Sequence, residues 1–578
     1  MERPTFFDNR IFPWVVSALI VAVVKFFSPW TLSWDEACQH EVAHRLVAGL
    51  GLTSTFLSIP SEDLCQDPLP RPYFHHPPGY SLLIAALLTL KLPILPSLRV
   101  LSFALTLGGW IGFGRIARLL FPAPEHPNER ATFPWMAAWI IPWLWSPWWR
   151  GTDLYLWALT PWVLLIGSLP GKAYPYATFT RALQDAFLGM LVGILYWIRY
   201  ASLFLLVWFH LWILIDTDCP RRFLIRRWIC FWLGFSPLFF LLQFFQRIAE
   251  TNHRGLIAPF LTIGGFGEVG SRLKELLLEL GNTAQPFFFF LPGSWRRELV
   301  QGWPSCLFLW LLAVALLLWP FFLLRKDRLA PSSPQRRLLK ACLWAILANF
   351  LTLSLAELAS HDMEQGKIPF LLEDRYFWPV GACYPLVGIA ALTGWRSGKA
   401  LARWATAIFS PQWRAITTLV SLLALAGLFI RQPLRQWTAK ALDEALRSME
   451  RPRNVFVTGK EKSKRYVHLL ARSHPGAAFY IEDYPFYAFD WDPFHNPLRP
   501  IPPPSFWQHA WCSCSKELFW ILGQSSPGAF SPKSSGYRKP LGNLGKHFSV
   551  ELVTFFPEEE VAIFHSVVPA GYRFRGEP

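Results

Sequence analysis

Residues 31–80 run from Thr31-Leu-Ser-Trp34-Asp35-Glu36 to Tyr73-Phe74-His75-His76-Pro77-Pro78-Gly79-Tyr80, and they separate two long apolar segments. The stretch is polar, with an acid pair near its start and a histidine pair at its end. Apolar runs of roughly 20 residues can cross a hydrocarbon core of ~30 Å. The sequence therefore predicts that both pairs lie at the mouths of consecutive membrane spans.

Runs of this kind recur along the chain. Of its 578 residues, 53% are hydrophobic and only 16% are charged, against about 25% charged in a soluble domain. The apolar runs predict 11 or 12 transmembrane helices, since the sixth run is long enough for two helices and Arg199 interrupts it. They cover 11–30, 79–95, 99–121, 132–149, 152–169, 183–217, 227–246, 303–324, 338–357, 376–394 and 413–431.

Loop charge predicts the orientation. The net charge of +16 is explained by the excess of arginine and lysine that membrane proteins carry in their cytoplasmic loops. We see no sequence pattern typical of nucleic-acid binding. The basic connections 221–227, 325–337 and 396–414 are then cytoplasmic. The loops 31–78, 247–302 and 358–375 and the tail face outside. A simple count puts Arg150 on the cytoplasmic side; a role for it outside would require the fourth and fifth segments to be short or re-entrant.

Two parts of the chain outside the membrane have patterns of their own. In residues 34–50, apolar side chains recur every four positions from Trp34 to Leu50, and Gly49 and Gly51 follow. This pattern predicts an amphipathic juxtamembrane helix that lies flat on the membrane and holds its acids at the interface. The composition shifts at the tail, so we divide the chain into a membrane domain, 1–432, and a soluble extracytoplasmic domain, 433–578. Strands at 455–457 and 477–481 and a helix at 462–473 predict a small α+β fold for the tail.

The acids and histidines of the first loop are candidates for chemistry. Asp35 or Glu36 can take a proton from an incoming hydroxyl or amine, or can simply favour the positive end of a helix. Glu36, His40 and His44 share one helix face and, with His75, are candidate ligands for a divalent metal, although solvated polar residues are the more common reading of such spacing. Cys38 and Cys65 share the loop and could form a disulfide.

Polar residues at the mouths of later spans are candidates for binding. Tyr73, His75 and His76 precede paired prolines that begin a helix, and they can bind phosphate or, for the histidines, metal. Ionisable groups at membrane depth are functional candidates, although a structural ion pair between helices is equally compatible. That set consists of Arg150, Asp153, Arg199 and, just outside a late span, Arg375 with Tyr376.

Together these residues resemble the polyprenyl-phosphate-sugar glycosyltransferases of the GT-C superfamily, especially the protein O-mannosyltransferase-like family and the lipid A aminoarabinose transferases. The resemblance covers about residues 10–395. It implies that Asp35 is the catalytic base, that Arg375 holds the lipid phosphate beside Tyr376, and that Arg150 and Asp153 shape the pocket. Relatives often carry an acidic and a basic residue before the paired prolines, where this chain has His75 and His76.

The resemblance implies an all-α, GT-C-like polytopic enzyme of the bacterial inner membrane with its active site on the outer face. It would transfer a sugar from a polyprenyl-phosphate donor to a protein, lipid or glycan, with no certain cofactor beyond a possible divalent metal. Three alternatives stay open. A ligase for lipid-linked oligosaccharides would need no acid base, a transporter would show internal repeats, and a degenerate transferase fold would act as a partner subunit.

Overall fold

The computed structural model describes residues 34–54, 71–72, 76–120, 151–168, 179–215, 221–248, 334–359, 378–383 and 386–387, and five strands between 454 and 567. The chain forms two compact units. One comprises residues 1–27 and 95–433, and the other comprises 28–94 and 434–578. The predicted first outer loop, 31–78, and the tail both belong to the second of these units.

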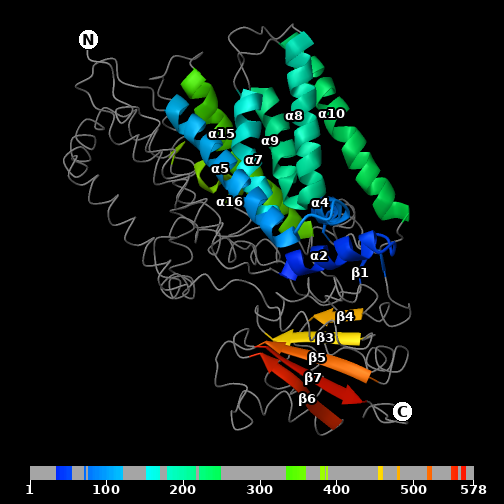
Figure 1. The fold of residues 1–578 in the computed structure, drawn as a ribbon. Coiled ribbons are helices and arrows are strands. Elements are labelled where there is room, and N and C mark those ends of the chain that lie inside the picture. The colour runs from blue at the N-terminus through cyan, green and yellow to red at the C-terminus, as the bar shows by residue number, and fades with distance from the viewer. Residues whose placement is uncertain are drawn as a thin grey trace, which may run out of the picture. The chain divides into compact units, whose positions relative to one another are not determined.

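The described part of the first unit is a bundle of helices (Figure 1). Helices suit these apolar stretches because every backbone polar group is satisfied within the segment, as a hydrocarbon surrounding requires. The bundle contains α5 (Ile94–Leu120), α7 (Thr152–Ser168), α8 (Phe179–Ile198), α9 (Leu203–Ile215), α10 (Arg221–Ile248), α15 (Pro334–Ala359) and the short α16 (Trp378–Gly381).

Within the described residues, three helices are long and apolar enough to cross a membrane, at Pro96–Leu120, Phe179–Ile198 and Phe223–Gln246. These helices confirm the prediction of a helical membrane protein. The predicted spans 11–30, 132–149, 303–324 and 413–431 lie outside the described residues, as does most of 376–394.

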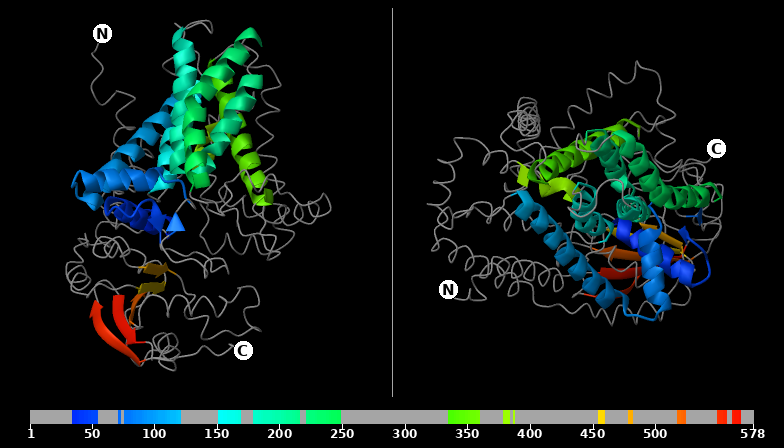
Figure 2. Two further views of the ribbon diagram at one scale, coloured as in Figure 1. Left: turned by 90° about the vertical axis from the view of Figure 1, so that its right-hand side faces the viewer. Right: turned by 90° about the horizontal axis from the view of Figure 1, so that it is seen from above.

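The sixth apolar segment forms two helices and not one. α8 ends at Ile198, Arg199 has an extended backbone (φ −151°, ψ 122°), and a short 3₁₀ turn, Tyr200–Ser202, leads into α9. The two views of Figure 2 and that of Figure 1 show α8 and α9 side by side. The arginine that interrupts the apolar run thus marks a reversal of the chain.

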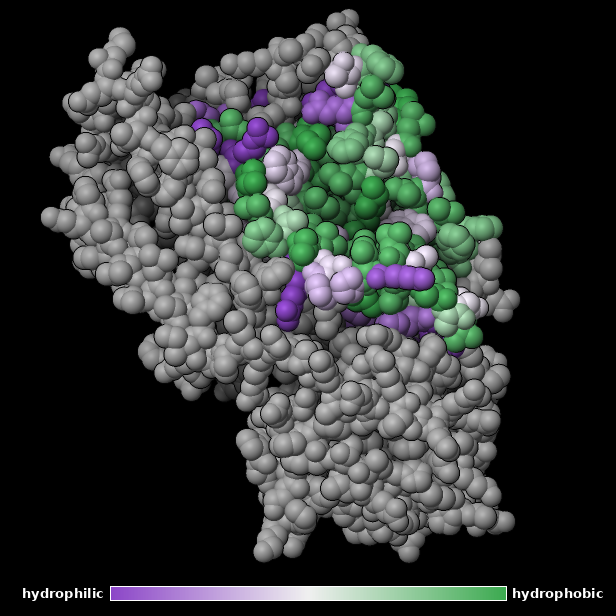
Figure 3. All heavy atoms as spheres, viewed as in Figure 1, coloured by the Kyte–Doolittle hydropathy of each residue, from purple (hydrophilic) through white to green (hydrophobic). Residues whose placement is uncertain are grey.

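α8 and α10 pack closely because glycines line their contact. A Cβ on Gly189 would overlap the carbonyl oxygen of Phe231, and one on Gly234 would overlap that of Ala186. Small residues let membrane helices approach in this way. The outward faces of both helices are apolar (Figure 3), as expected for a lipid-facing surface; their most exposed residues include Leu183, Phe187, Ile225, Ile229, Leu233, Phe240 and Phe244.

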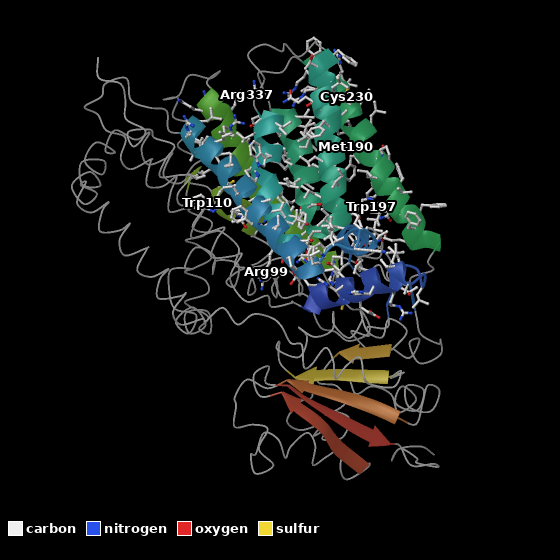
Figure 4. The ribbon with its side chains drawn as sticks, in the orientation of Figure 1. Arg99, Trp110, Met190, Trp197, Cys230 and Arg337 are labelled. Atoms are coloured by element: carbon white, nitrogen blue, oxygen red, sulfur yellow. The ribbon has the colours of Figure 1, made fainter. Side chains whose placement is uncertain are left out.

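The contacts between α5 and α7 show how these two helices run relative to each other. Gly109 and Gly112 of α5 lie against Trp157 and Pro161 of α7 in the same order, so α5 and α7 are parallel. Arg99 lies near the first end of α5, and Arg337, near the start of α15, lies at the opposite end of the bundle (Figure 4). α5 and α7 therefore enter the bundle from the same side.

The second unit begins with α2 (Trp34–Val47), β1 (Thr53–Ser54), β2 (Arg71–Pro72) and α4 (Gly79–Thr89). Gly49 and Gly51 have positive φ values of 79° and 74° and lead the chain out of α2, which confirms the predicted helix and its end. β1 and β2 pair antiparallel. The Arg45 Nε donates to Thr53 Oγ1 at 3.0 Å and ties α2 to β1.

The tail contributes one five-stranded sheet in the order β4-β3-β5-β7-β6. Its strands are β3 (Asn454–Gly459), β4 (Ala478–Ile481), β5 (Glu517–Gly523), β6 (Ser549–Phe556) and β7 (Val561–Val567). β3 pairs parallel with β4 and β5, while β7 pairs antiparallel with β5 and β6. The two predicted strands are confirmed. Parallel pairing requires a crossover connection between β3 and β4, where the predicted helix 462–473 lies outside the described residues.

Candidate active site

The acid pair of the first loop lies in the first turn of α2. Asp35 is the second residue of the helix and Glu36 the third, so both favour the positive end of the helix dipole. The Glu36 side chain is buried, whereas that of Asp35 lies outside the described part of the chain. A buried carboxylate here could act as a base or as part of a polar cluster.

The described polar side chains of α2 are buried, which corrects the more common reading of Glu36, His40 and His44 as solvated residues. Six of its polar side chains are at most 7% exposed: Glu36, Gln39, His40, Glu41, His44 and Arg45. Cys38, Val42 and Ala43 are buried as well, and among the described side chains of α2 exposure rises only at the end of the helix, where Val47 is 46% exposed. The correction has a physical reason: tertiary packing covers both sides of α2, which a helical pattern in the sequence cannot reveal.

Burial also affects the titration of this helix. Desolvation lowers the pKa of Arg45 from its ordinary value, and the nearby Glu41 opposes that shift. Burial removes water from around the Arg45 guanidinium, so its electrostatic interactions are stronger than they would be in water.

α4 lies against α2 and begins where the paired prolines predict. Pro78 precedes its first residue, Gly79, with a helical backbone (φ −75°, ψ −8°), which confirms the predicted helix start. The rings of His40 and Tyr80 meet edge to face with centroids 6.3 Å apart. His76 is half-buried just before the helix. Tyr73 and His75 lie outside the described residues.

The metal hypothesis gains no geometric support in the described part. No three His, Cys, Asp or Glu side chains come together there in a way that could hold a metal ion, even though Glu36, His40 and His44 follow one another at successive turns of α2. His75, the fourth candidate, is outside this part. Cys38 is buried and Cys65 is not described, so the disulfide stays a prediction.

In the membrane unit, Asp153 and Arg199 form a buried ion pair. The Arg199 Nε lies 2.8 Å from Asp153 Oδ1, and the two side chains are 7% and 15% exposed. A second guanidinium nitrogen donates to Thr152 Oγ1 at 3.2 Å. The first turn of α7 is thereby joined to the reversal between α8 and α9. Of the sequence candidates, this is the pair that the structure brings together.

A neighbouring hydrogen bond ties the same reversal to α10. The Gln246 Nε2 donates to the Tyr200 hydroxyl oxygen, and Tyr196 lies beside Tyr200 with ring centroids 5.3 Å apart. Four helix ends therefore meet in polar contacts: the start of α7, the end of α8, the start of α9 and the end of α10.

These contacts revise the side of the membrane expected for the start of α7, the helix that follows Arg150 in the sequence. Thr152 and Asp153 lie with Arg199, at the opposite end of the bundle from the basic start of α10. If that basic end is cytoplasmic, as loop charge predicts, the Asp153 end is on the outside. The count failed at α4, whose 11 residues span only about 16 Å and cannot cross the membrane. Because the sixth apolar segment forms two helices, α8 and α9, the total number of crossings is unchanged, and the orientation predicted for the helices after α9 stays the same.

A second buried charge cluster was not among the sequence candidates. The Asp185 carboxylate of α8 receives Arg227 Nε of α10 at 3.2 Å and Arg181 Nη2 at 3.4 Å. Both arginines also donate to the carbonyl oxygen of Gly167, near the end of α7, at 3.3 Å. The cluster lies at the C-terminal end of α7. The negative end of the helix dipole there favours the net positive charge of two arginines and one aspartate. Arg181 and Asp185, spaced i, i+4 beside an apolar run, were the available signal.

Several predicted residues stay outside the described part of the chain: Tyr73, His75, Arg150, Arg375 and Tyr376. Their contacts, and any role in binding a lipid phosphate, remain predictions. The described site therefore has two separate parts, the buried polar helix α2 in one unit and the Asp153–Arg199 pair in the other.

The sequence matches no protein-family model and none of the curated proteins. Solved structures do show likeness. ArnT from Cupriavidus metallidurans is 15% identical in its apo state, with 96% of this chain and 98% of that chain covered and a TM-score of 0.44. Its form bound to undecaprenyl phosphate is 14% identical over the same shares, with a TM-score of 0.43.

The Archaeoglobus fulgidus oligosaccharyltransferase, in complex with Zn and sulfate, is 12% identical. The match covers 97% of this chain and 74% of that chain, with a TM-score of 0.46. ArnT and this enzyme are both GT-C family members. Because the identities are 15% or lower and the TM-scores are below 0.5, these matches do not carry an activity over to this chain.

Proposed function

We propose that this chain is an integral membrane glycosyltransferase that moves a sugar from a polyprenyl-phosphate donor to an acceptor on the outer membrane face. The observation that supports it best is α2: an acid pair stands in the first turn of a helix whose polar side chains are buried. A carboxylate in such water-poor surroundings interacts more strongly with nearby charges than one in water. This property suits a base that acts beside a membrane-bound donor.

The reaction needs a base for the acceptor's proton and positively charged or hydrogen-bonding groups that stabilise the negative charge on the leaving phosphate. The acceptor oxygen or nitrogen attacks the anomeric carbon and gives its proton to the Asp35 carboxylate, with Glu36 beside it. The bond between that carbon and the phosphate oxygen breaks, and polyprenyl phosphate leaves with the electron pair. In this proposal Arg375, Tyr376, Tyr73, His75 and His76 stabilise the phosphate, since arginine and histidine can interact with anionic oxygens.

Arg150, Asp153 and Arg199 have a supporting place in this proposal. The guanidinium of Arg199 is already engaged by Asp153 and Thr152. It therefore holds the outer ends of α7, α8 and α9 together and supports the part of the bundle that Arg150 precedes. Arg150, which precedes α7 directly, is the candidate to contact the donor.

The outer face is favoured by two independent features. Loop charge puts residues 31–78 and the tail on the same side of the membrane, and both belong to one compact unit. This grouping suits a site formed beside the tail, with acceptor recognition in the tail or in the 247–302 loop. We assign the chain to a bacterial inner membrane as part of the same proposal.

The test is transfer of radiolabelled sugar by the purified, full-length protein from a panel of polyprenyl-phosphate sugars. Asp35→Asn should abolish turnover while the variant keeps its unfolding temperature. Glu41→Gln is the matched control, since it neutralises another buried acid of α2 and should retain turnover. Chelator treatment of the wild type then tests the metal hypothesis for Glu36, His40, His44 and His75.

The outcomes separate the alternatives. Full activity of Asp35→Asn would overturn its assignment as base. A folded wild type that neither transfers nor hydrolyses any single-sugar donor would contradict the proposal. Transfer of a whole glycan from a lipid-linked oligosaccharide would then identify a ligase, and binding without turnover a partner subunit or a transporter.

A further inference from the structure

Gln39 lies one helical turn after Asp35 on α2. Side chains at positions i and i+4 of a helix are neighbours, with Cβ atoms about 5–6 Å apart. The backbone of α2 therefore puts residue 39 on the same face of the helix as residue 35, one turn further along. Sequence patterns gave no reason to single it out, since glutamine is common on the polar side of a helix.

The structure sets Gln39 apart by its burial. Its side chain is 1% exposed, and neither its Oε1 nor its Nε2 has a hydrogen-bond partner in the described part of the chain. Two other glutamines in that part do have partners: Gln184 donates to Ile166 O at 3.0 Å and accepts from Arg181, and Gln246 donates to Tyr200. An amide buried without a partner destabilises the fold, so a site that keeps one is a candidate for binding a ligand.

The chemistry of the amide indicates the kind of ligand. A carboxamide presents one accepting oxygen and an NH₂ group that donates. A phosphate oxygen only accepts hydrogen bonds, so a phosphate would leave Oε1 of Gln39 unpaired. A sugar offers adjacent hydroxyl groups that both donate and accept, and can satisfy the two ends of the amide at once.

We propose that Gln39 binds hydroxyl groups of the donor's sugar and positions the sugar beside Asp35. This inference rests on the function proposed above and adds a residue that recognises the transferred group. It separates the donor into two parts: the lipid phosphate, which Gln39 does not contact, and the sugar, which it does.

The experiment compares two lipids on the full-length protein in nanodiscs. One is a sugar-bearing polyprenyl phosphate chosen from the donor panel, and the other is polyprenyl phosphate alone. For Gln39→Leu, we expect affinity for the sugar-bearing lipid to fall by roughly tenfold and affinity for the bare lipid to stay unchanged. Gln243→Leu, which changes a half-buried glutamine of α10, is the matched control and should bind both lipids as the wild type does.

Stability provides a second readout. Leucine has a similar volume and no polar atoms, so Gln39→Leu without ligand should unfold at the same temperature as the wild type or higher. A lower unfolding temperature or failure to fold would show that the amide has a structural partner, and would overturn the inference. Equal loss of affinity for both lipids, or unchanged affinity for both, would overturn it as well.

The result also separates this inference from the proposed function. If the wild type transfers sugar and Gln39→Leu binds donor normally, only the role of Gln39 is wrong. If the wild type binds and transfers no donor, both proposals fail. An effect of Gln39→Leu confined to the acceptor's KM would contradict the assignment to the donor.

Discussion

Asp153 and Arg199 join the first turn of α7 to the reversal between α8 and α9 through a contact of 2.8 Å between Oδ1 and Nε. Both side chains are largely buried. The pair lies at a point where a long apolar segment would otherwise continue as one helix, so it stabilises the hairpin that replaces that helix.

Removing one partner of this pair should be costly. Asp153→Asn or Arg199→Met removes the buried ion pair but keeps one of its two charges in place, and we expect a loss of about 3–5 kcal/mol in unfolding free energy. Thermal unfolding in detergent measures it. The double variant Asp153→Leu with Arg199→Met should lose less than either single change. Single variants as stable as the wild type would show that the pair does not hold the reversal.

The Arg181–Asp185–Arg227 cluster predicts an asymmetric response. Asp185→Asn removes the carboxylate that contacts both buried arginines, whereas Arg181→Leu keeps the ion pair between Asp185 and Arg227. Asp185→Asn should therefore destabilise the protein more, by about 3–5 kcal/mol. Comparing the unfolding temperatures of the two variants tests this order, and a larger effect of Arg181→Leu would contradict it.

The glycine contact between α8 and α10 offers a matched pair of substitutions. Gly189→Ala places a Cβ against the Phe231 carbonyl, but Gly108→Ala on α5 meets nothing within 4 Å. We expect Gly189→Ala to lower stability by more than about 1 kcal/mol through backbone displacement. Gly108→Ala should be neutral or slightly stabilising, since alanine favours helices. Equal effects of both substitutions on unfolding would argue against the close contact.

The revised topology can be tested by cysteine labelling in cells, after the nine native cysteines are replaced. Leu92, just after α4, is 44% exposed, and Leu92→Cys should react with a membrane-impermeant maleimide from outside, because α4 is too short to span. Arg118→Cys, at the other end of α5, should react only after permeabilisation. Labelling of Arg118→Cys alone in intact cells would restore the original count.

The sequence by itself determined the class of this protein and the existence of its elements. Apolar runs of membrane length dictate helices, because no other open structure satisfies backbone polar groups in lipid. Proline pairs and glycines fixed the start of α4 and the end of α2, since both residues act through their own backbone geometry. These properties are local.

Only the tertiary structure decided what depends on distant neighbours. The burial of Gln39 and its companions on α2, the Asp153–Arg199 pair and the carboxylate shared by Arg181 and Arg227 each join segments far apart in the chain or depend on what covers a helix. A one-dimensional pattern shows which side of a helix is polar, but the packing of other elements decides whether that side meets water. For the same reason, hydropathy alone predicted a membrane span at α4, which is too short to cross. It also left open whether the segment around Arg199 forms one helix or two.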